Sequence, residues 1–363
     1  MKKEIVTAGF LLLSLTLPLK ASAAIFSQFN VFGDSLSDTG NVFNLTGGLR
    51  NSTQAIPPSP PYFNGRFSNN KVWVDFVGEE LGLTPTPITN LAVQLTTTLP
   101  NGTNYAFGGS NSGEDNAFVP GIPGVLAQVR SYTQPFLTSN QKVDPNGLYA
   151  IWGGANDYLF SQKTDVNQIV KNLSDSVELL AQAGAKNILV FNLPDLGKAP
   201  LVFGSENSSI LTTLTNIHNA ELATSVDQLS NKIPGVNIIP VDINSLVTRV
   251  LTNPREFGFK DVTNPCVVGN TIQGKIESVC DNPNDFLFFD TVHPTSPTHR
   301  LVANTVLAAI KPKSVPESSS ALGLLALGAL GGAAMLKRRQ TQSTMTVVLN
   351  EIPSPQSSCT SVT

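Results

Sequence analysis

The sequence predicts an α/β fold built on a mainly parallel β-sheet, and two observations favour this fold. Short, nearly continuous apolar runs alternate along the 363-residue chain with amphipathic segments. The apolar runs do not alternate apolar with polar residues, and such continuous runs are typical of parallel strands that helices cover on both faces. A chain of this length can form one large domain or two ordinary ones, with a deep core.

Four apolar runs are predicted to be strands: Phe29–Gly33, Leu148–Gly153, Asn187–Leu193 and Val236–Val241. Four amphipathic segments are predicted to be helices: Val72–Leu81, Val166–Ala183, Ile210–Leu229 and Thr298–Ile310. Ser35 lies just past the first strand, and Asn156 lies just past the second. Ligands bind outside the carboxyl ends of the strands in such sheets, so both side chains are expected on the same rim.

Composition and charge argue against a nucleic-acid partner. The net charge is −3, and no stripe of Lys and Arg occurs in the sequence, whereas nucleic-acid binding calls for a basic patch. Charged residues make up 13% of the chain, about half of the ordinary share. Such a low charge suits an exported protein.

The first 23 residues are predicted to be a secretory signal peptide. Lys2 and Lys3 precede an apolar run over residues 5–19, and an Ala-x-Ala cleavage motif follows at residues 21–23. The alternative is a signal anchor that stays attached, but a proline and a lysine interrupt the run. We therefore expect residues 1–23 to be removed on export.

Export also permits disulfide bonds. Of the three cysteines, Cys266 and Cys280 are close in sequence with glycines between them. They are predicted to close one loop and to leave Cys359 unpaired. No CxxC pair or histidine-rich spacing indicates a metal site, and no cofactor is expected.

The chain changes character after the last predicted helix. Residues 313–320 form a Pro/Ser-rich linker, residues 321–339 form an apolar run with the basic end KRR, and residues 340–363 are polar and predicted to be disordered. A membrane span needs about 20 apolar residues, so a buried helix is the alternative to an anchor. The linker and the basic end favour an anchor, with the main domain, residues 24–312, on the outer side of the membrane.

The stretch FGDSLSDTGN, residues 32–41, contains the first candidate for chemistry. Asp, Ser, Asn and Gly commonly close turns, so turn formation alone can account for the stretch. The other interpretation is a nucleophilic serine, Ser35, held at the carboxyl edge of the sheet. A serine nucleophile needs a base within hydrogen-bond reach and a third group that orients the base.

The chain has three histidines, so few bases need to be considered. His218 lies within a predicted helix, where a packed or solvated side chain is expected. His299 follows a Ser-Pro helix start and is assigned to local structure. His293 lies in a loop in FLFFDTVHPTSP, and Asp290, three residues earlier, can orient its Nδ1 and leave Nε2 free for Ser35.

Two turns rich in glycine and asparagine can supply donors to a tetrahedral oxyanion. They are NYAFGGS, residues 104–110, and WGGANDY, residues 152–158. Glycine lets a backbone N–H approach a substrate closely, and an asparagine side chain adds a further donor. Either turn taken alone is better explained as an ordinary turn.

Together, the four segments resemble the GDSL esterases and lipases of the SGNH hydrolase superfamily. FGDSLSDTGN matches the serine block, NYAFGG the glycine block, GGAND the asparagine block and DTVHP the histidine block, over about residues 28–310. The resemblance implies a flavodoxin-like three-layer sandwich with a five-stranded, mainly parallel sheet. No G-x-S-x-G or G-x-G-x-x-G motif points to a different hydrolase or to a dinucleotide site.

The resemblance also implies a role for individual residues. Ser35 would be the nucleophile, His293 the general base and Asp290 the carboxylate that orients the base. The oxyanion hole would consist of the Ser35 N–H, the Gly108 N–H and the Asn156 side-chain amide. Gly109 remains an alternative to Gly108. Asp34 and Asp38 would shape the turn that exposes the Ser35 hydroxyl.

The segment VPESSSALGLLALGALGGAAMLKRR, residues 315–339, resembles the PEP-CTERM sorting signal of certain Gram-negative bacteria. It departs from that signal at Ser318, where the family has proline, and in the residues 340–363 that follow its basic end.

The expected function is a secreted serine esterase or lipase that acts on carboxylic esters through an acyl-enzyme. Acyl lipids and acylated extracellular polysaccharides are both open as substrates. The alternatives are an acyltransferase of the same fold and a non-catalytic cell-surface binding protein with a vestigial triad. The expected location is extracellular or at the cell surface, with the C-terminal segment on a membrane.

Overall fold

The structure is a computed structural model that describes residues 26–47, 55–91, 101–270 and 275–311. The predicted signal peptide, linker, anchor and tail lie outside the described residues. Among the helices of the described ranges, none is long and apolar enough to cross a membrane.

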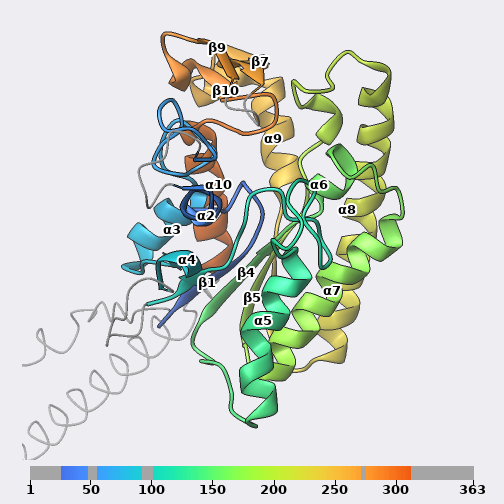
Figure 1. Cartoon of the computed structure of the whole chain (residues 1–363). Helices are drawn as coiled ribbons and strands as arrows, with labels where there is room; N and C mark the ends of the chain where they lie inside the picture. The colour runs from blue at the N-terminus through green and yellow to red at the C-terminus, as the bar shows by residue number, and fades with distance from the viewer. Residues whose placement is uncertain (1–25, 48–54, 92–100, 271–274, 312–363) are drawn as a thin grey trace, which may run out of the picture. The chain divides into compact units, whose positions relative to one another are not determined.

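A parallel sheet of six strands forms the centre of the fold (Figure 1). In spatial order the strands are β2 (Thr86–Pro87), β3 (Thr103–Asn104), β1 (Phe29–Gly33), β4 (Leu148–Trp152), β5 (Asn187–Phe191) and β6 (Asn237–Val241). Every neighbouring pair is parallel. The predicted α/β fold with a mainly parallel sheet is therefore confirmed. The sheet has six strands where five were expected, and the two at one edge contain only two residues each.

Burial explains why the central strands lack in–out alternation. Every residue of β1 and of β4 is buried, as expected for strands that helices cover on both faces. β1 lies between β3 and β4, with Val31 opposite Ala150. The first predicted strand is thus central in the sheet, and its carboxyl end lies at the middle of the rim.

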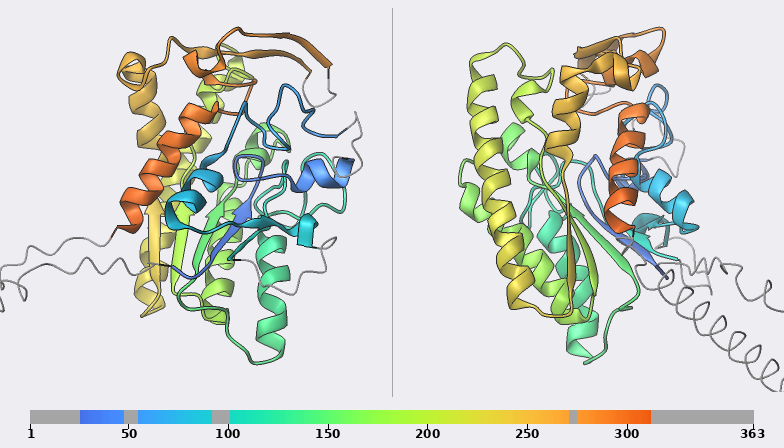
Figure 2. Two further views of the ribbon diagram at one scale, coloured as in Figure 1. Left: turned by 90° about the vertical axis from the view of Figure 1, so that its left-hand side faces the viewer. Right: turned by 180° about the vertical axis from the view of Figure 1, so that it is seen from behind.

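Helices cover both faces of the sheet (Figures 1 and 2). On one face lie α5 (Val125–Thr138), α7 (Val166–Ala183) and α8 (Glu206–Lys232). On the other face lie α3 (Trp73–Leu81) and α10 (Ser296–Ile310), with α9 (Ile243–Thr252) against α10. The shorter helices are α2 (Asn41–Thr46), α4 (Ile88–Leu91) and α6 (Ala155–Leu159), with 3-10 turns η2 (Leu196–Lys198), η3 (Pro254–Phe257) and η5 (Pro283–Asp285).

The sequence explains where the long helices begin and end. The Asp165 side chain accepts a hydrogen bond from the Gln168 N–H and caps the start of α7, and Gly184, with φ of 111°, ends it in the left-handed conformation. α8 is longer than the predicted 210–229, but its buried residues recur every three or four positions as expected: Leu211, Thr215, His218, Leu222, Val226 and Leu229.

A small β cap lies next to the carboxyl edge of the sheet (Figure 1). In it, β7 (Asp261–Pro265) pairs with β10 (Phe286–Phe288), and β8 (Val267–Asn270) forms a hairpin with β9 (Lys275–Val279). The structure places a disulfide between Cys266 and Cys280, with an S–S distance of 2.00 Å, at the base of this hairpin. The buried Cys266 packs with Tyr62, Val267 and Phe289 in a small separate core.

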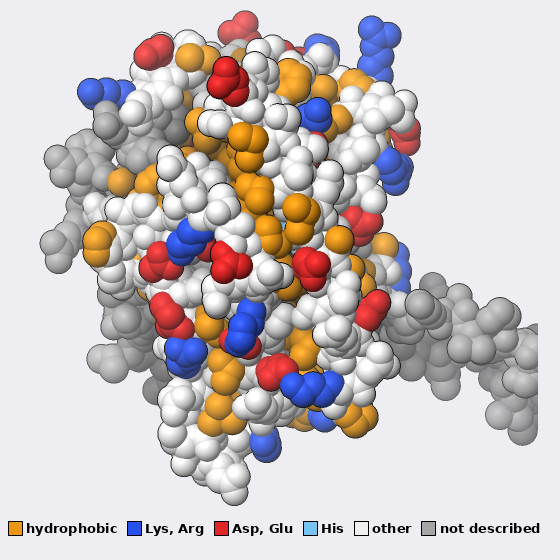
Figure 3. All heavy atoms as spheres, turned by 90° about the vertical axis from the view of Figure 1, so that its right-hand side faces the viewer, with side chains coloured by type: hydrophobic (Ala, Val, Ile, Leu, Met, Phe, Trp, Pro, Cys, Tyr) orange, Lys and Arg blue, Asp and Glu red, His pale blue; other side chains and the backbone are white. Residues whose placement is uncertain are grey.

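The outer surface of α7 and α8 carries charges of both signs, without a patch of one sign (Figure 3). The ion pairs Lys171–Asp175 and Lys232–Glu178 lie on these two helices. Exposed pairs of this kind contribute little to stability.

Candidate active site

Ser35 lies in a tight turn directly after β1. The Asp34 carbonyl accepts hydrogen bonds from the N–H groups of Ser37 and Asp38, each at 3.0 Å, and the Asp34 carboxylate accepts one from the Leu36 N–H at 3.0 Å. A Cβ on Gly33 would lie 2.8 Å from the Trp152 carbonyl oxygen, so no side chain fits there. The turn therefore holds Ser35 at the rim, where 8% of it is exposed.

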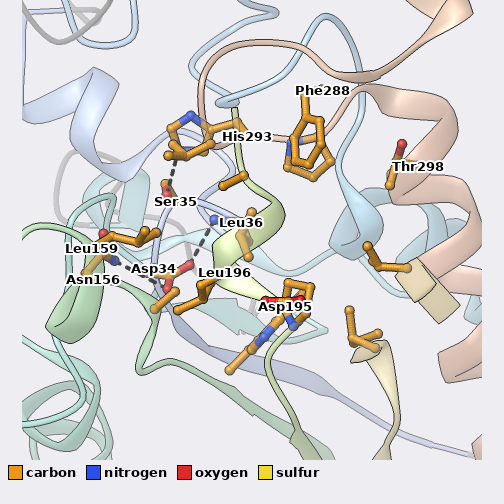
Figure 4. Close-up of a pocket in the computed structure, with 18 of the residues that line it drawn as sticks. Asp34, Ser35, Leu36, Asn156, Leu159, Asp195, Leu196, Phe288, His293 and Thr298 are labelled. Atoms are coloured by element: carbon orange, nitrogen blue, oxygen red, sulfur yellow. Dashed lines mark hydrogen bonds between the residues drawn. The ribbon is translucent and has the colours of Figure 1, made fainter. Parts of the chain in front are cut away.

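Ser35, His293 and Asp290 form one connected line of hydrogen bonds. Ser35 Oγ lies 2.8 Å from His293 Nε2 (Figure 4). His293 Nδ1 lies 2.7 Å from Asp290 Oδ2. The structure thus brings the three predicted residues together in the arrangement in which a base activates a serine and a carboxylate orients the base.

The Asp290 carboxylate receives two further kinds of donor. The Tyr62 hydroxyl donates to Oδ2 at 2.6 Å, and the N–H groups of Val292 and His293 donate to Oδ1 at 2.9 and 2.7 Å. Burial alone would raise the pKa of Asp290, but the facing His293 and these hydrogen bonds lower that pKa below its usual range. Asp290 is therefore held as an anion. As an acceptor it favours the form of His293 in which Nδ1 carries the proton and donates it to Asp290. Sequence reasoning missed Tyr62.

The Phe67 ring packs against the His293 ring. The two ring centroids are 5.0 Å apart, with the planes tilted by 34°. A Cβ on Gly108 would lie 2.6 Å from the Phe67 ring. Because residue 108 is a glycine and has no side chain, the Phe67 ring has room beside His293.

The structure changes the assignment of the oxyanion donors. The Gly108 N–H donates to Asp38 Oδ2 at 3.0 Å, so it is not free for a substrate. The N–H groups of Ser35 and Gly109 have no acceptor among the described residues. Gly109 adopts a φ of +80° at the rim and lines the same pocket as Ser35. Of the two glycines that the sequence left open, Gly109 is therefore the one whose N–H is available to a substrate.

Asn156, the third predicted donor, lies at the start of α6 beside Ser35. Its Nδ2 donates to the Ser110 carbonyl at 2.9 Å and makes a longer contact of 3.4 Å to Asp34 Oδ2 (Figure 4). The short bond fixes the amide, and the long one is weak enough to be exchanged for a substrate oxygen. Burial raises the pKa of Asp34 to about 7, so much of this carboxyl is neutral near neutral pH.

Asp38 joins the serine block to the glycine block. It accepts four backbone hydrogen bonds, from Gly40 and Asn41 to Oδ1 and from Val42 and Gly108 to Oδ2. Burial raises the pKa of Asp38 to about 6 even though these donors favour the charged form. The predicted turn-shaping role of Asp38 thus extends to the positioning of a second loop.

Two buried amides, which sequence reasoning missed, reinforce the rim. The Gln128 side chain on α5 pairs with the Gly33 backbone, with N–H donating to Oε1 and Nε2 donating to the carbonyl, both at 2.9 Å. Asn104 Nδ2 donates to the Ser37 carbonyl at 2.7 Å. Gln128 lies far in sequence from Gly33, and no local motif marks it; Asn104 begins the glycine block NYAFGG, but nothing in that block indicates its contact with Ser37.

The other two histidines lie outside the triad. His218 Nδ1 lies 3.0 Å from the Tyr158 hydroxyl on α6, and burial lowers the pKa of His218 to about 4. His299 is fully buried on α10, and neither ring nitrogen has a hydrogen-bond partner among the described residues. Burial and the neighbouring His293 lower the pKa of His299 to about 3.

Two apolar pockets meet at Ser35. We call them the core pocket, which runs toward α9 and α10 (Figure 4), and the loop pocket, which runs toward α2 and the glycine turn. They enclose about 840 and 870 Å³, open mouths included. Within the described ranges, no group of three His, Cys, Asp or Glu side chains is arranged to hold a metal ion.

A family model described as GDSL-like Lipase/Acylhydrolase matches residues 30–306. This range contains all four segments that carry the predicted site.

Three curated relatives extend the comparison. The chain is 30% identical to the phosphatidylcholine-sterol acyltransferase of Aeromonas hydrophila, over 72% of this chain and 71% of that protein. It is 31% identical to Esterase EstA of Pseudomonas aeruginosa, over 82% of this chain and 49% of that protein. It is 26% identical to GDSL esterase/lipase 6 of Arabidopsis thaliana, over 82% of this chain and 90% of that protein. The chain thus spans about half the length of the Pseudomonas esterase.

The buried His299 generates a prediction about pH. An unfolded histidine titrates at about 6.5, and the folded pKa of His299 is about 3. Between pH 6.5 and pH 3 the unfolded state binds a proton on this histidine and the folded state does not. The free energy of unfolding is therefore highest above pH 6.5 and decreases as the pH falls below it. Replacement by an apolar side chain, in His299→Leu, should reduce the stability lost between pH 7.5 and 4.5 by about 2–3 kcal/mol.

Urea unfolding of wild type and His299→Leu at both pH values measures this effect. At pH 7.5 the variant should be as stable as wild type or more stable, because it removes two buried ring nitrogens without partners. Equal pH dependence in the two proteins would show that His299 is hydrated in solution.

Proposed function

Because this chain belongs to the GDSL-like lipase/acylhydrolase family, we propose that it is an exported serine esterase that acts through an acyl-enzyme intermediate. Hydrolysis of ester bonds is the chemistry of this family and the enzyme class that the sequence predicts. The observation that carries the proposal is the continuous line of hydrogen bonds from Ser35 through His293 to Asp290. A vestigial triad would have no need to preserve this line, so the arrangement favours an enzyme over a binding protein.

In the first half-reaction, Ser35 Oγ attacks the ester carbonyl carbon while His293 Nε2 takes the hydroxyl proton. Asp290 stabilises the imidazolium that forms, with its other oxygen held by backbone N–H groups. The carbonyl oxygen becomes an oxyanion beside the Ser35 N–H, the Gly109 N–H and the Asn156 amide. The tetrahedral intermediate then collapses, His293 gives its proton to the alkoxide, and the alcohol leaves.

In the second half-reaction, water attacks the acyl-Ser35 ester. His293 again takes the proton, and the same donors stabilise the second oxyanion. Collapse releases the carboxylic acid and returns the proton to Ser35 Oγ. For Asn156 to donate in either half, the substrate oxygen must replace Asp34 Oδ2 as acceptor for the second amide hydrogen, and the 3.4 Å length of the Asp34 contact keeps the cost small.

Acyl transfer is the second candidate function. It requires only that an alcohol replace water in the second half-reaction. The relative from Aeromonas hydrophila is a phosphatidylcholine-sterol acyltransferase, which favours this variant. Product analysis in the presence of an added apolar alcohol separates the two, since transfer yields a new ester and hydrolysis yields only free acid.

The N-terminal sequence and the disulfide support export. A basic start, an apolar run and an Ala-x-Ala motif fit a signal peptide, and a disulfide persists in oxidising compartments. We also propose that the apolar segment 321–339, with its basic end, attaches the exported protein to the outer face of a membrane.

Export predicts two properties of the mature protein. Its N-terminal sequence should begin at or near Ala24, and alkylation of the denatured, unreduced full-length chain should label Cys359 but neither Cys266 nor Cys280. Mass spectrometry after tryptic digestion measures both. A chain that keeps Met1 and labels at all three cysteines would contradict export.

Ser35→Ala tests the proposed enzyme. Hydrolysis of p-nitrophenyl esters from acetate to palmitate should fall by several orders of magnitude, because the variant cannot form the acyl-enzyme. The melting temperature should change little, since Ser35 lies at the rim of the sheet. Ser37→Ala is the matched control: it removes a nearby hydroxyl, and it should keep most of the activity. Undiminished hydrolysis by a well-folded Ser35→Ala protein would reject the mechanism.

Asn156→Ala tests the oxyanion hole. Loss of one such donor typically lowers kcat by about 10²–10³, and KM should change little because the bond forms mainly in the transition state. The control is Asn219→Ala on α8, which removes two hydrogen bonds to the Leu193 backbone but does not line the site. If Asn156→Ala lowers the melting temperature without lowering kcat, Asn156 serves only the fold.

A further inference from the structure

We infer that the substrate is an ester with an apolar group on each side of the ester bond, a long acyl chain in the core pocket and an apolar alcohol in the loop pocket. This inference rests on the proposed function, and it selects lipid-like esters over acetylated sugars. It starts from the way in which the two pockets meet. They share Ser35, Asn156, Phe160, Val292 and His293.

The shared residues lie where the reacting carbonyl must be. A carbonyl carbon bonded to Ser35 Oγ carries its oxyanion toward Asn156 and the backbone donors. Its two remaining substituents are the acyl chain and the ester oxygen with the alcohol. Two pockets that diverge from the nucleophile therefore provide one space for each half of an ester.

The core pocket is suited to an apolar chain. Along its length Leu36, Leu196 and Phe288 line the way from Ser35 toward α10 (Figure 4). Its far end is formed by the buried side chains of Ile243 and Val302. Burial of one methylene group changes a binding or rate constant by about fourfold, so a chain that fills this pocket should be strongly preferred to acetate.

Two polar side chains that line the core pocket, Asp195 and Thr298, already hold hydrogen bonds, whereas the buried Trp152 Nε1 has no partner among the described residues. Asp195 Oδ1 accepts hydrogen bonds from the Gly197 N–H at 3.0 Å and the Thr212 hydroxyl at 2.7 Å. The Thr298 hydroxyl donates to the Leu287 carbonyl at 3.0 Å. A sugar carries several hydroxyls and would find few partners there beyond Trp152 Nε1 and Asp195 Oδ2, so most of its hydroxyls would lose water without replacement, which is costly.

The loop pocket is also apolar beyond the catalytic residues. The Thr46 hydroxyl donates to the Val42 carbonyl and accepts from the Ile56 N–H, each at 2.8 Å. At its outer edge lie three exposed apolar side chains, Phe118 (43% exposed), Val119 (41%) and Leu201 (42%). An apolar alcohol group can contact this edge, whereas a free sugar gains little from it.

The order of the two half-reactions indicates which pocket holds the acyl chain and which holds the alcohol. The alcohol leaves first, while the acyl group stays bonded to Ser35 until water arrives. The pocket with exposed apolar side chains at its edge suits the group that leaves early. The pocket that ends among buried residues suits the group that stays.

Two ester series measure the assignment. In one, the acyl chain of p-nitrophenyl esters runs from acetate to palmitate. In the other, the alcohol of butyrate esters runs from ethanol to decanol, with a butyrylated monosaccharide as the polar member. For the wild type, kcat/KM should rise at least tenfold along each series and should be lowest for the sugar ester.

Substitutions in each pocket test which half of the ester that pocket binds. Val247→Trp on α9 fills part of the core pocket, and it should lower the palmitate-to-acetate ratio of kcat/KM at least tenfold. Thr248→Trp, on the exposed side of the same helix, should leave this ratio unchanged. Leu201→Glu should lower the decyl-to-ethyl ratio, while Phe203→Glu, which is equally exposed and does not line the pocket, should not.

A binding measurement gives a readout without turnover. Calorimetric titration of Ser35→Ala with dodecanoate should show binding, and the added Val247→Trp change should weaken it at least tenfold. Circular dichroism and melting temperature show whether each variant is folded.

The outcomes separate this inference from the proposed function. It is overturned if wild type prefers acetate or the sugar ester, or if Val247→Trp alters the alcohol ratio instead of the acyl ratio; in both cases a Ser35-dependent esterase still stands. Lack of any Ser35-dependent hydrolysis would reject the proposed function itself. If dodecanoate then still binds and Val247→Trp weakens its binding, the core pocket remains an acyl site.

Discussion

The buried carboxylate of Asp290 is the group on which the rest of the candidate site depends. A carboxylate that loses water is costly unless donors replace the water. Here the donors come from two directions, the neighbouring backbone and the Tyr62 hydroxyl. Tyr62 is in turn packed against Cys266 and Phe289. The disulfide-linked cap therefore supports the residue that orients the base, although the cap contributes no catalytic group.

A second set of polar contacts explains why separate loops can act as one site. Asp38 ties the turn after β1 to the glycine turn, and Asn104 ties the strand before that glycine turn back to Ser37. Gln128, on helix α5, holds the end of β1 through its two hydrogen bonds with the Gly33 backbone. Buried networks in which the hydrogen bonds are satisfied fix one geometry. The rim is thus positioned by side chains that do not touch a substrate.

The sequence predicted those parts of the molecule whose signal is local. The continuous apolar run of β1 and the three-residue spacing of Asp290 and His293 need no distant partner to be recognised. Tyr62 lies 228 residues from the carboxylate that it contacts, and nothing beside it marks the contact. Helix α5 escaped prediction because its sequence contains Pro135 and because a polar residue, Gln128, lies on its buried face. Gly108 and Gly109 cannot be told apart locally, since an aspartate 70 residues away engages only one of them.

The position of β1 has a consequence for when activity can first appear. The proposed nucleophile directly follows the first strand, and its proposed base lies 258 residues later, just before the last helix of the domain. Contacts that are so distant in sequence form late, because a long loop must be closed before they stabilise the fold. A nascent chain that ends before residue 293 carries the serine without its base. The chain therefore has no complete line of hydrogen bonds from Ser35 to Asp290 until almost all of the domain has been synthesised.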